Sequence, residues 1–468
     1  MARLRLAPRA QVLAAGFAAI RAELRLPAAF PPEVEAEAAA ATPAEAAYAD
    51  RLSLPLVTID PPGARDLDQA YHACRRGPGY RVSYAIADPG AFVRPGGALD
   101  AESRARGATL YAPDARVPLY PAVLGEGRAS LLPDGERRAV LWTFDLDADG
   151  AVETARMERA LVRSRAQLDY AGVQAAVDAG TADEPLLLLR EIGLLRIGLE
   201  VARGGVSLPT PAQEVVEADG GYALAFVAPL PAETWNAQVS LMTGMAAATV
   251  MLEGGVGLLR TMPPPSREAV DTLRRSASAL GCAWPAAMSY PELIRSLDPA
   301  VPAHAALLTV ATTLLRGAGY AAFDGAPPAV KEHSAIAAPY AHATAPLRRL
   351  ADRFVNEVVL ALSAGAEVPG WCRAALPSLP GLMAAADRRE RELDNAVLDY
   401  LEAAVLERRV GETFAAVVTE AGEKGGMVQL AEPAVRARLV GTAPLGERIT
   451  VRLTEADPAR RRVRFAPV

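Results

Sequence analysis

The pattern of apolar and polar positions divides the chain into three parts, of which the first is helical. Residues 1–50 are rich in alanine, arginine and glutamate and show helical periodicity at 8–25 and again near 43–51. The Pro-Pro pair at 31–32 separates the two stretches, and we expect it to break the helical pattern. This pattern predicts a small helical module. A helix-turn-helix and an appendage that only packs on the next domain fit it equally well.

The second part, residues 51–410, alternates between strand-like and helix-like segments. Short apolar or alternating runs bounded by Gly, Pro and Asp predict strands at 54–60, 80–88, 139–147 and 151–163. Longer periodic stretches predict helices at 186–205, 232–253, 266–281, 304–316, 347–365 and 380–410, the last of them long and charged. Together these segments predict one large α+β domain.

The third part, residues 411–468, contains five short strand-like runs with Gly- or Pro-bearing turns between them. Five strands in about 60 residues are typical of a small OB-like β-barrel. We therefore expect an OB-fold domain at the C-terminal end of the sequence.

Composition narrows the class of protein. The apolar fraction of 51% is enough for a real core, which excludes wholesale disorder. No apolar run is long enough to span a membrane, and the charged start has no signal-peptide pattern, so we expect a cytoplasmic protein that is not bound to a membrane.

The three cysteines are isolated, and no two of the four histidines have a metal-ligand spacing, so neither a disulfide framework nor a zinc site is expected. The net charge of −6 argues only weakly against nucleic-acid binding, because such binding depends on local patches of positive charge.

The densest chemistry lies in the segment TIDPPGARDLDQA. Asp60 ends a predicted strand, and Asp66 and Asp68 follow a Pro-Pro-Gly turn that can fold them back beside it. Three carboxylates that converge repel one another unless a hard cation neutralises them, and Mg²⁺ prefers oxygen ligands. The segment therefore favours a magnesium site, although aspartates also cap turns without any metal.

Arginines follow at a second place, in HATAPLRRLADRF. Arg348 and Arg349 come just after Thr-Ala-Pro, where a loop is expected to enter a helix. A proline at the helix start and free backbone N–H groups form an anion site, and arginine can grip a phosphate oxygen. The alternative is an ordinary solvated helix face. A carboxylate site for metal together with a phosphate-binding arginine is what phosphodiester hydrolysis requires.

The order and spacing of these motifs resemble the ribonuclease II/R (RNB) family of 3′→5′ exoribonucleases over roughly residues 52–405. The matching segments are TIDPPGARDLDQA, YRVSYAIADPGAFVRPGGALDAESRARGATLYAPDARVPLYP, ASLLPDGERRAVLWTFDLDADG, QLDY, YAHATAPLRRLADRF and RRERELD. The resemblance implies an RNB-type catalytic domain followed by an OB-fold domain that binds RNA.

The resemblance also implies roles for the aspartates. Three positions of the family's aspartate signature match Asp60, Asp66 and Asp68, which in the family hold the catalytic magnesium ions, and Asp68 is expected to be essential for catalysis. The fourth position is Gln69, where the family has aspartate. Glutamine offers a carbonyl oxygen but no charge, so this departure bears directly on metal binding.

Further roles follow from the same resemblance. Tyr111 is expected to contact RNA near the scissile end and Tyr170 to stack on the terminal bases, while Arg348 steadies the scissile phosphate with Arg349 beside it. Glu390 matches a further catalytic position on the long helix, with a one-residue offset in the following motif. Gln238 stands where the family commonly has a glutamate near the RNA 3′ end.

The function implied is a hydrolytic exoribonuclease that removes 5′-mononucleotides from a single-stranded RNA 3′ end with little sequence preference. Two Mg²⁺ ions are expected during catalysis, for which Mn²⁺ can substitute, and the protein is expected to act as a monomer. The alternative, motivated by Gln69 and Gln238, is an RNA-binding member of the same family whose catalytic site has weakened.

Overall fold

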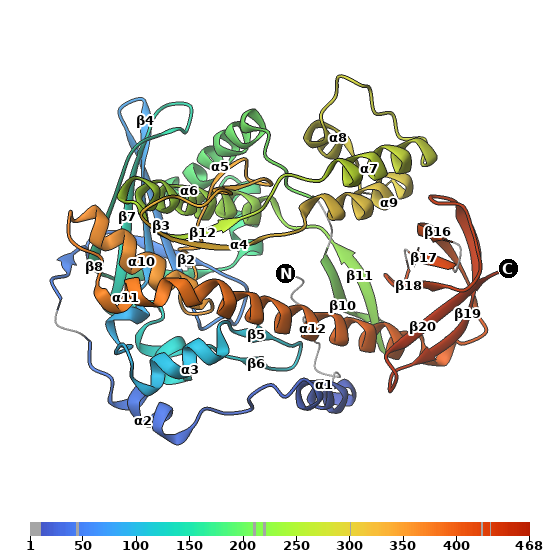
Figure 1. The fold of residues 1–468 in the computed structure, drawn as a ribbon, viewed down its shortest axis with the longest axis horizontal. Coiled ribbons are helices and arrows are strands. Elements are labelled where there is room, and N and C mark those ends of the chain that lie inside the picture. Colours follow the sequence, from blue (N-terminus) through green and yellow to red (C-terminus); the bar gives the residue numbers. More distant parts are fainter. Residues whose placement is uncertain are drawn as a thin grey trace.

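A computed structural model of the chain describes residues 11–43, 46–208, 212–218, 221–299, 301–422, 425–430 and 432–468. The molecule is elongated, with a large β-sheet at one end and a small β-barrel at the other (Figure 1). In these described ranges no helix is long and apolar enough to cross a membrane. The predicted α+β class is confirmed.

The large sheet has seven strands in the order β1-β8-β7-β4-β3-β2-β9. Its centre is antiparallel, whereas β1 pairs with β8 and β2 pairs with β9 in parallel. Their bounds are β1 Ala49–Asp50, β2 Leu56–Ile59, β3 Gln69–Arg76, β4 Gly79–Ala87, β7 Arg137–Leu146, β8 Val152–Val162 and β9 Ser164–Leu168. Strand β4 is apolar and buried along nearly its whole length, because structure covers both faces of the sheet.

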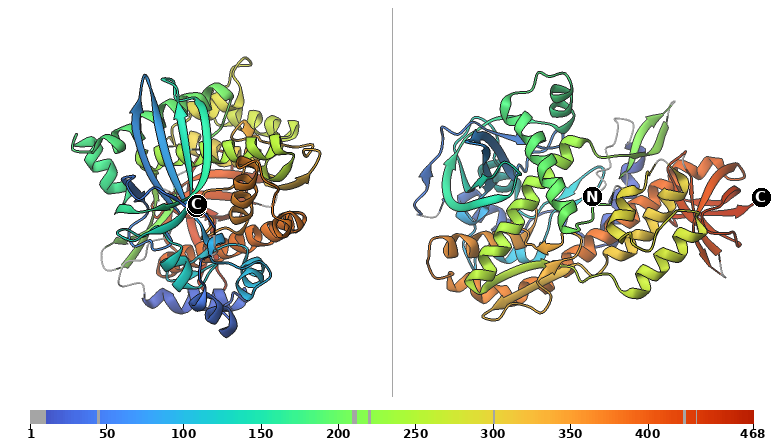
Figure 2. Two further views of the ribbon diagram at one scale, coloured as in Figure 1. Left: turned by 90° about the vertical axis from the view of Figure 1, so that its left-hand side faces the viewer. Right: turned by 90° about the horizontal axis from the view of Figure 1, so that it is seen from above.

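Three helices cover one face of this sheet: α5 (Glu184–Arg203), α6 (Pro231–Gly254) and α10 (Leu350–Ser363). Their apolar residues share one core with Tyr84 and Trp142 of the sheet. A second core on the opposite face includes residues of α2 (Pro32–Ala40) and α3 (Ala98–Arg106). Two further views show the helices against the sheet (Figure 2). The sheet is thereby held rigidly between two packed layers.

The predicted long charged helix is α12 (Leu379–Leu406), which runs from the sheet region to the barrel (Figure 1). The barrel is closed, with the strand order β16-β17-β18-β20-β19. Its strands are β16 Thr413–Gly422, β17 Gly425–Leu430, β18 Arg436–Leu439, β19 Arg448–Asp457 and β20 Arg462–Pro467. All five predicted strands are present, so the OB-like barrel is confirmed.

The N-terminal segment differs in part from the prediction. Helix α1 spans Gln11–Glu23, but Pro32 begins helix α2 instead of breaking a helix, because a proline suits the first turn of a helix. Residues 46–51 are not helical, and β1 joins the large sheet there. Helix α1 packs against α12 and α2 packs against α3, so the two helices lie on separate parts of the molecule.

The remaining elements connect these layers. They are β5 Leu110–Tyr111, β6 Arg116–Val117, α4 Tyr170–Asp178, β10 Ala212–Ala218, β11 Gly221–Val227, β12 Val256–Thr261, α7 Arg267–Ala279, α8 Tyr290–Ser296, α9 Pro302–Ala311, β13 Gly319–Asp324, β14 Glu332–His333, β15 Ala338–Pro339 and α11 Gly370–Ala375. Short helical turns lie at Pro89–Ala91, Leu124–Arg128, Thr312–Leu315, Leu376–Ser378 and Glu407–Arg409.

Candidate active site

The aspartate-bearing loop connects β2 to β3 and is fixed by a serine from another part of the chain. The N–H of Leu67 donates to Oγ of Ser130 at 2.9 Å, and that hydroxyl donates to the carbonyl of Arg65 at 2.6 Å. The N–H of Leu131 in turn donates to the carbonyl of Leu67 at 3.0 Å. These bonds hold the loop still on both sides of Asp66, and they place Asp68 at the entrance to β3.

Asp68 is the most deeply buried of the predicted carboxylates, with 3% of its surface exposed. Its Oδ1 accepts from the N–H of Leu347 at 2.8 Å, and its Oδ2 accepts from Nε of Arg348 at 3.0 Å. Burial is the main cause that raises the pKa of Asp68 to about 7, and the charges of Asp66 and Asp352 raise it further. The Arg348 charge and the Leu347 hydrogen bond act in the opposite direction and lower this pKa. The fold thus joins two motifs that lie 280 residues apart.

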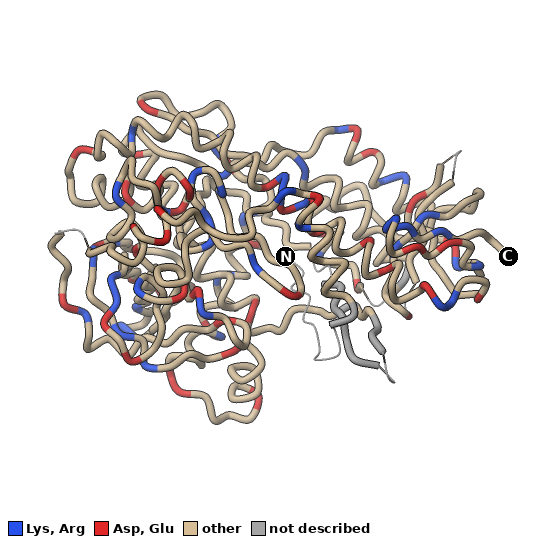
Figure 3. The backbone as a smooth tube through the Cα atoms, turned by 90° about the horizontal axis from the view of Figure 1, so that it is seen from below, with Lys and Arg blue, Asp and Glu red and all other residues tan. Residues whose placement is uncertain are grey.

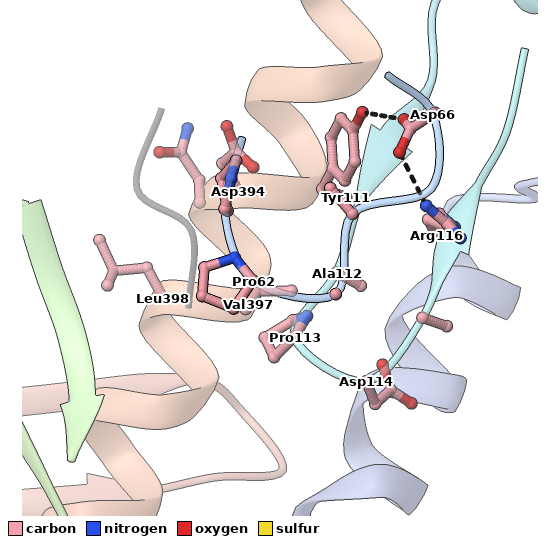
Figure 4. A pocket seen from close by; sticks show the side chains of 15 residues that line it. Pro62, Asp66, Tyr111, Ala112, Pro113, Asp114, Arg116, Asp394, Val397 and Leu398 are labelled. Atoms are coloured by element: carbon pink, nitrogen blue, oxygen red, sulfur yellow. Dashed lines mark hydrogen bonds and ion pairs between the residues drawn. The ribbon is translucent and has the colours of Figure 1, made fainter. Parts of the chain in front are cut away.

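Asp66 lies beside the hairpin of β5 and β6. Tyr111 donates its hydroxyl to Oδ2 of Asp66 at 2.9 Å, and Nη1 of Arg116 donates to Oδ1 at 2.9 Å (Figure 4). Arg116 also pairs with Glu126 at 2.7 Å through its other terminal nitrogen. Burial, followed by the Asp66 charge, raises the pKa of the Tyr111 phenol well above its ordinary value. Tyr111 is therefore a neutral donor at this carboxylate.

Asp60 lies beside the QLDY segment because β2 and β9 run in parallel. Ile59 pairs with Leu168, and the N–H of Asp60 donates to the carbonyl of Leu168 at 3.0 Å. Tyr170 begins α4 two residues later, and its hydroxyl accepts from Nδ2 of Asn236 at 3.1 Å. Parallel strands end at the same edge of a sheet, which explains why the two motifs lie together.

Tyr84 is a buried residue at the centre of this group that the sequence did not single out. Its hydroxyl shares a hydrogen bond of 2.8 Å with Oγ of Ser240. Burial raises its pKa far above the ordinary value, and the charges of Tyr170, Asp60 and Arg348 also act on it. Its position in an apolar strand, YRVSYAIAD, is typical of core packing and gives no signal of a polar role.

The two glutamines are engaged in hydrogen bonds that do not involve the aspartates. Nε2 of Gln69 donates to the carbonyl of Thr344, just before the arginine motif. Gln238 is buried in α6, where its Nε2 donates to Oε2 of Glu200 at 2.6 Å. Ser207 donates to the other oxygen of that carboxylate at 2.7 Å. Gln238 thus joins α6 to α5 and to the segment that follows it.

The arginine motif differs from the expected anion site. Helix α10 begins at Leu350, so Pro346 lies in the preceding turn and not at the helix start. The backbone N–H groups there are engaged, that of Leu347 with Asp68 and those of Arg348 and Arg349 with the carbonyl of Ala345. The proline therefore does not begin the helix as expected, and the N–H groups of residues 347–349 already have partners within the protein.

Arg349 is held by its own helix. Its Nε and Nη2 donate to the buried carboxylate of Asp352 at 2.5 and 2.7 Å. Oδ1 of Asp352, which accepts from Nη2 of Arg349, also accepts from the N–H of Ala345 at 2.8 Å. Arg348 remains more open, with 35% of its side chain exposed. Only Arg348 of the two therefore pairs with an aspartate of the signature.

Glu390 lies on α12, outside the contacts of the aspartate loop described above. Burial raises its pKa to about 6, and the charges of Asp394 and Asp387 on the same helix add to this. Asp387 pairs with Arg260 of β12 at 3.0 Å. Glu390 therefore belongs to an acidic stretch of α12 whose next turn reaches the candidate site through Asp394.

A cavity of about 450 Å³ opens beside Asp66 (Figure 4). Its walls are the aspartate loop, the β5–β6 hairpin and one turn of α12, and its lining includes Pro62, Asp66, Tyr111, Asp394 and Leu398. Asp394 and Arg116, both in this cavity, are site residues that sequence reasoning missed. Arg116 follows Tyr111 by five residues within the segment YAPDAR, which is part of the resemblance to the RNB family. Its position in that segment could have identified it as a site residue.

The carboxylates do not form a ready-made metal site. Among the described residues, no three His, Cys, Asp or Glu side chains gather closely enough to hold a metal ion. The reason is that Arg116 and Arg348, remote in sequence, supply the positive charge that was expected from a cation. The donor set still fits Mg²⁺ chemically, because it consists of carboxylate oxygens. Burial raises the pKa of Asp68, so a nearby cation would stabilise the ionised form of this carboxylate. Along the described part of the backbone, basic and acidic residues are interspersed (Figure 3).

Comparison with known proteins agrees with this architecture. A model of the RNB domain matches residues 49–364, about two thirds of the chain. The chain belongs to the RNB domain family. A second model, the RNase II-type exonuclease C-terminal S1 domain, matches residues 412–468, which form the barrel. The RNB match includes the aspartate loop and Arg348 but ends before Glu390 and α12.

Individual relatives support the RNB assignment. Ribonuclease R of Escherichia coli is 28% identical over 475 residues, which cover 90% of this chain and 58% of that protein. The apo structure of Mycoplasma genitalium RNase R has a TM-score of 0.86 at 18% identity, covering 97% of this chain and 77% of that one. Similar structures of the same protein contain ribose-methylated single-stranded RNA and double-stranded RNA. Yeast Ssd1, a pseudonuclease, has a TM-score of 0.70 at 15% identity, covering 89% of this chain and 55% of that one. The fold alone therefore does not decide between an active and an inactive RNB protein.

Proposed function

We propose that this RNB protein is a hydrolytic, magnesium-dependent 3′→5′ exoribonuclease that releases 5′-mononucleotides from single-stranded RNA with little sequence preference. The observation that carries the proposal is the contact between Asp68 and Arg348, which joins the two motifs of the RNB domain at a buried site. A carboxylate and a phosphate-binding guanidinium at one point suit phosphodiester hydrolysis.

Arg348 would bind the phosphate at the scissile bond. Its Nε is used on Asp68, and a guanidinium has four further N–H donors in a planar fork. Because 35% of the side chain is exposed, these donors can meet a phosphate that enters from solvent. The guanidinium would counter the negative charge that develops on the phosphate oxygens in the transition state.

The tyrosines would orient the RNA end. Tyr111 lies in the wall of the cavity and is anchored through its hydroxyl to Asp66, while Tyr170 is anchored to Asn236. Each hydroxyl bond fixes one edge of a ring, which would orient the ring for stacking on a base. Stacking of this kind is worth about 1–3 kcal/mol per base and depends little on base identity. This supports weak sequence preference.

Asp60, Asp66 and Asp68 would hold Mg²⁺, with a carbonyl oxygen from Gln69. When bound, the ion supplies an acidified water and neutralises charge at the phosphate. Arg116 and Arg348, which pair with Asp66 and Asp68, would share these carboxylates with the ion and keep further N–H donors for an RNA phosphate.

A second candidate function is that of an RNA-binding member with a weakened site. One observation favours it. The side-chain amide of Gln69 donates to the carbonyl of Thr344, at a position where an aspartate would add a fourth negative charge. In this alternative the protein binds RNA but cleaves it slowly or not at all.

The test is the time course of mononucleotide release from single-stranded RNA labelled at its 3′-terminal nucleotide, with Mg²⁺ and with EDTA. We expect release with Mg²⁺ only, and we expect Asp68→Asn to lower turnover by about 10³-fold or more while RNA affinity stays within about two-fold, because the change removes charge and not stacking surface. A mobility shift without cleavage under both conditions would establish the RNA-binding alternative. Near-normal cleavage by Asp68→Asn would refute the proposed role of the aspartates.

A further inference from the structure

Helix α1 lies where the candidate site, α12 and the barrel meet. Its buried face consists of Leu13, Phe17 and Ile20. These side chains belong to one apolar cluster with Leu110 and Val117 of the β5–β6 hairpin, and with residues of α12 and of the barrel. Phe17 also meets the ring of Tyr400 on α12 edge to face. In Figure 1, α1 lies alongside α12 near this hairpin.

Two ion pairs extend from the end of α1 in different directions. The guanidinium of Arg21 grips the carboxylate of Asp114 with both terminal nitrogens, at 2.5 and 3.0 Å. Glu23 pairs with Arg461 of the barrel at 2.6 Å. The Arg21–Asp114 pair is partly shielded, since about a fifth of each side chain is exposed. A bidentate, partly shielded pair is more effective than an ordinary surface ion pair.

Asp114 lies in the turn of the hairpin that carries Tyr111. The hairpin has only two paired positions, Leu110 with Val117 and Tyr111 with Arg116. A two-stranded ribbon of this length is marginally stable on its own, so it depends on contacts from outside. Tyr111 and Arg116 both bind Asp66, and residues 111–116 line the cavity beside it.

We propose that Arg21 is a positioning residue, which holds the turn of the β5–β6 hairpin so that Tyr111 and Arg116 remain on Asp66. Helix α1 is then part of the candidate active site, although it lies outside the RNB match and touches none of the reacting groups. The consequence for RNA rests on the proposed function, whereas the consequence for the hairpin itself does not.

The experiment measures hydrogen–deuterium exchange of the amides of residues 110–117 in the free protein. Arg21→Gln and Asp114→Asn should each make this segment exchange about five-fold faster, the change in opening equilibrium expected from one partly shielded ion pair. Glu23→Gln is the matched control, because it removes the second ion pair of the same helix and leaves Asp114 untouched. It should leave exchange at 110–117 unchanged.

A charge exchange separates the ion pair from general damage to the helix. Arg21→Glu should loosen the hairpin more than Arg21→Gln, and the double change Arg21→Glu with Asp114→Arg should return exchange to within about two-fold of the parent. Normal exchange at 110–117 in Arg21→Gln, or failure of the double change to restore it, would overturn the proposal.

The same variants separate this role from the proposed function. We expect KM for single-stranded RNA to rise about five-fold in Arg21→Gln while kcat changes by less than about two-fold, because a loose hairpin weakens binding and leaves Asp68 and Arg348 in place. If the parent protein releases no mononucleotides, the proposed function fails while the exchange result still decides the role of Arg21. If exchange responds but KM does not, Arg21 holds the hairpin as proposed, but the hairpin does not bind RNA, which overturns the consequence for RNA.

Discussion

Single residues at the candidate site show that arginines do what a cation was expected to do. Asp68 is buried, which makes its charge costly, and Arg348 and a backbone N–H offset part of that cost. Asp66 is compensated in the same way by Arg116. A metal that binds here must therefore compete with built-in positive charge. This makes the number of negative ligands important, and it directs attention to Gln69.

The first prediction concerns Gln69→Asp. It should tighten the apparent affinity for Mg²⁺ by about ten-fold, because the number of charged ligands tunes the affinity of oxygen sites for hard cations. The measurements are Mn²⁺ binding to the RNA-free protein and the Mg²⁺ dependence of the initial rate. Gln167→Asp is the matched control, since Gln167 is a nearby glutamine whose amide also donates to a backbone carbonyl, that of Ala64 at 2.7 Å. Equal titrations for the two variants would mean that position 69 is not a ligand.

At the scale of elements, the site depends on strand order and on helices packed at the correct distance. Parallel pairing of β2 with β9 brings Asp60 to the QLDY segment, and the turn before α10 brings Arg348 to Asp68. Helix α1 contributes through close packing. A Cβ added at Gly16 would lie 2.1 Å from the ring of Tyr400, so the helix approaches α12 as closely as a glycine allows.

The second prediction concerns this close approach. Gly16→Ala should destabilise the protein by about 1–3 kcal/mol, because overpacking outweighs the better helix propensity of alanine. Gly198→Ala is the control, since Gly198 is also inside a helix but has open space where the Cβ would be, and this change should stabilise by about 0.5–1 kcal/mol. Thermal unfolding of both variants checks the opposite signs. A stabilised Gly16→Ala would show that α1 can move away from α12 at little cost.

At the scale of the whole molecule, the barrel is joined to the RNB domain and is not a loosely tethered module. Helix α12 contributes Glu402, which accepts from the N–H of Arg436, and the N–H of Ala434 donates to the carbonyl of Leu224. Apolar residues of α1, α12 and the barrel share one cluster. Removing the barrel would expose this cluster, so its role is better tested with surface substitutions.

The basic strand of the barrel is more balanced than its sequence suggests. Arg462 and Arg464 both pair with Glu455, at 3.6 and 3.3 Å, and Arg460 pairs with Asp457. Arg462 and Arg464 remain exposed enough to meet a phosphate, with 46% and 41% of their side chains accessible. RNA binding by this face would therefore involve two arginines that share one acidic partner.

The third prediction is that Arg462→Ala with Arg464→Ala weakens binding of long single-stranded RNA. The slope of log affinity against log salt should become shallower by about 1.4, the value for two lost phosphate contacts on a single strand, while cleavage of short oligonucleotides at saturation survives. Arg75→Ala with Arg76→Ala is the control of equal charge, at the end of β3 in the sheet. Equal salt slopes for the two double variants would show that this face of the barrel does not bind RNA.

The sequence by itself determined the elements and the candidate chemistry. Periodicity located α5, α6, α10, α12 and the five barrel strands, because an apolar face repeats at 3.6 or 2 residues whatever it packs against. The spacing of Asp60, Asp66 and Asp68 together with the Arg-Arg pair pointed to phosphate chemistry, because a carboxylate metal site and a phosphate-binding arginine are what phosphodiester hydrolysis requires. Tertiary structure decided which charges meet. The pairing of Asp68 with Arg348 and the bracing of Asp114 by Arg21 join segments 280 and 93 residues apart. No local pattern encodes such contacts, since each depends on how sheet, hairpin and helices are stacked in space.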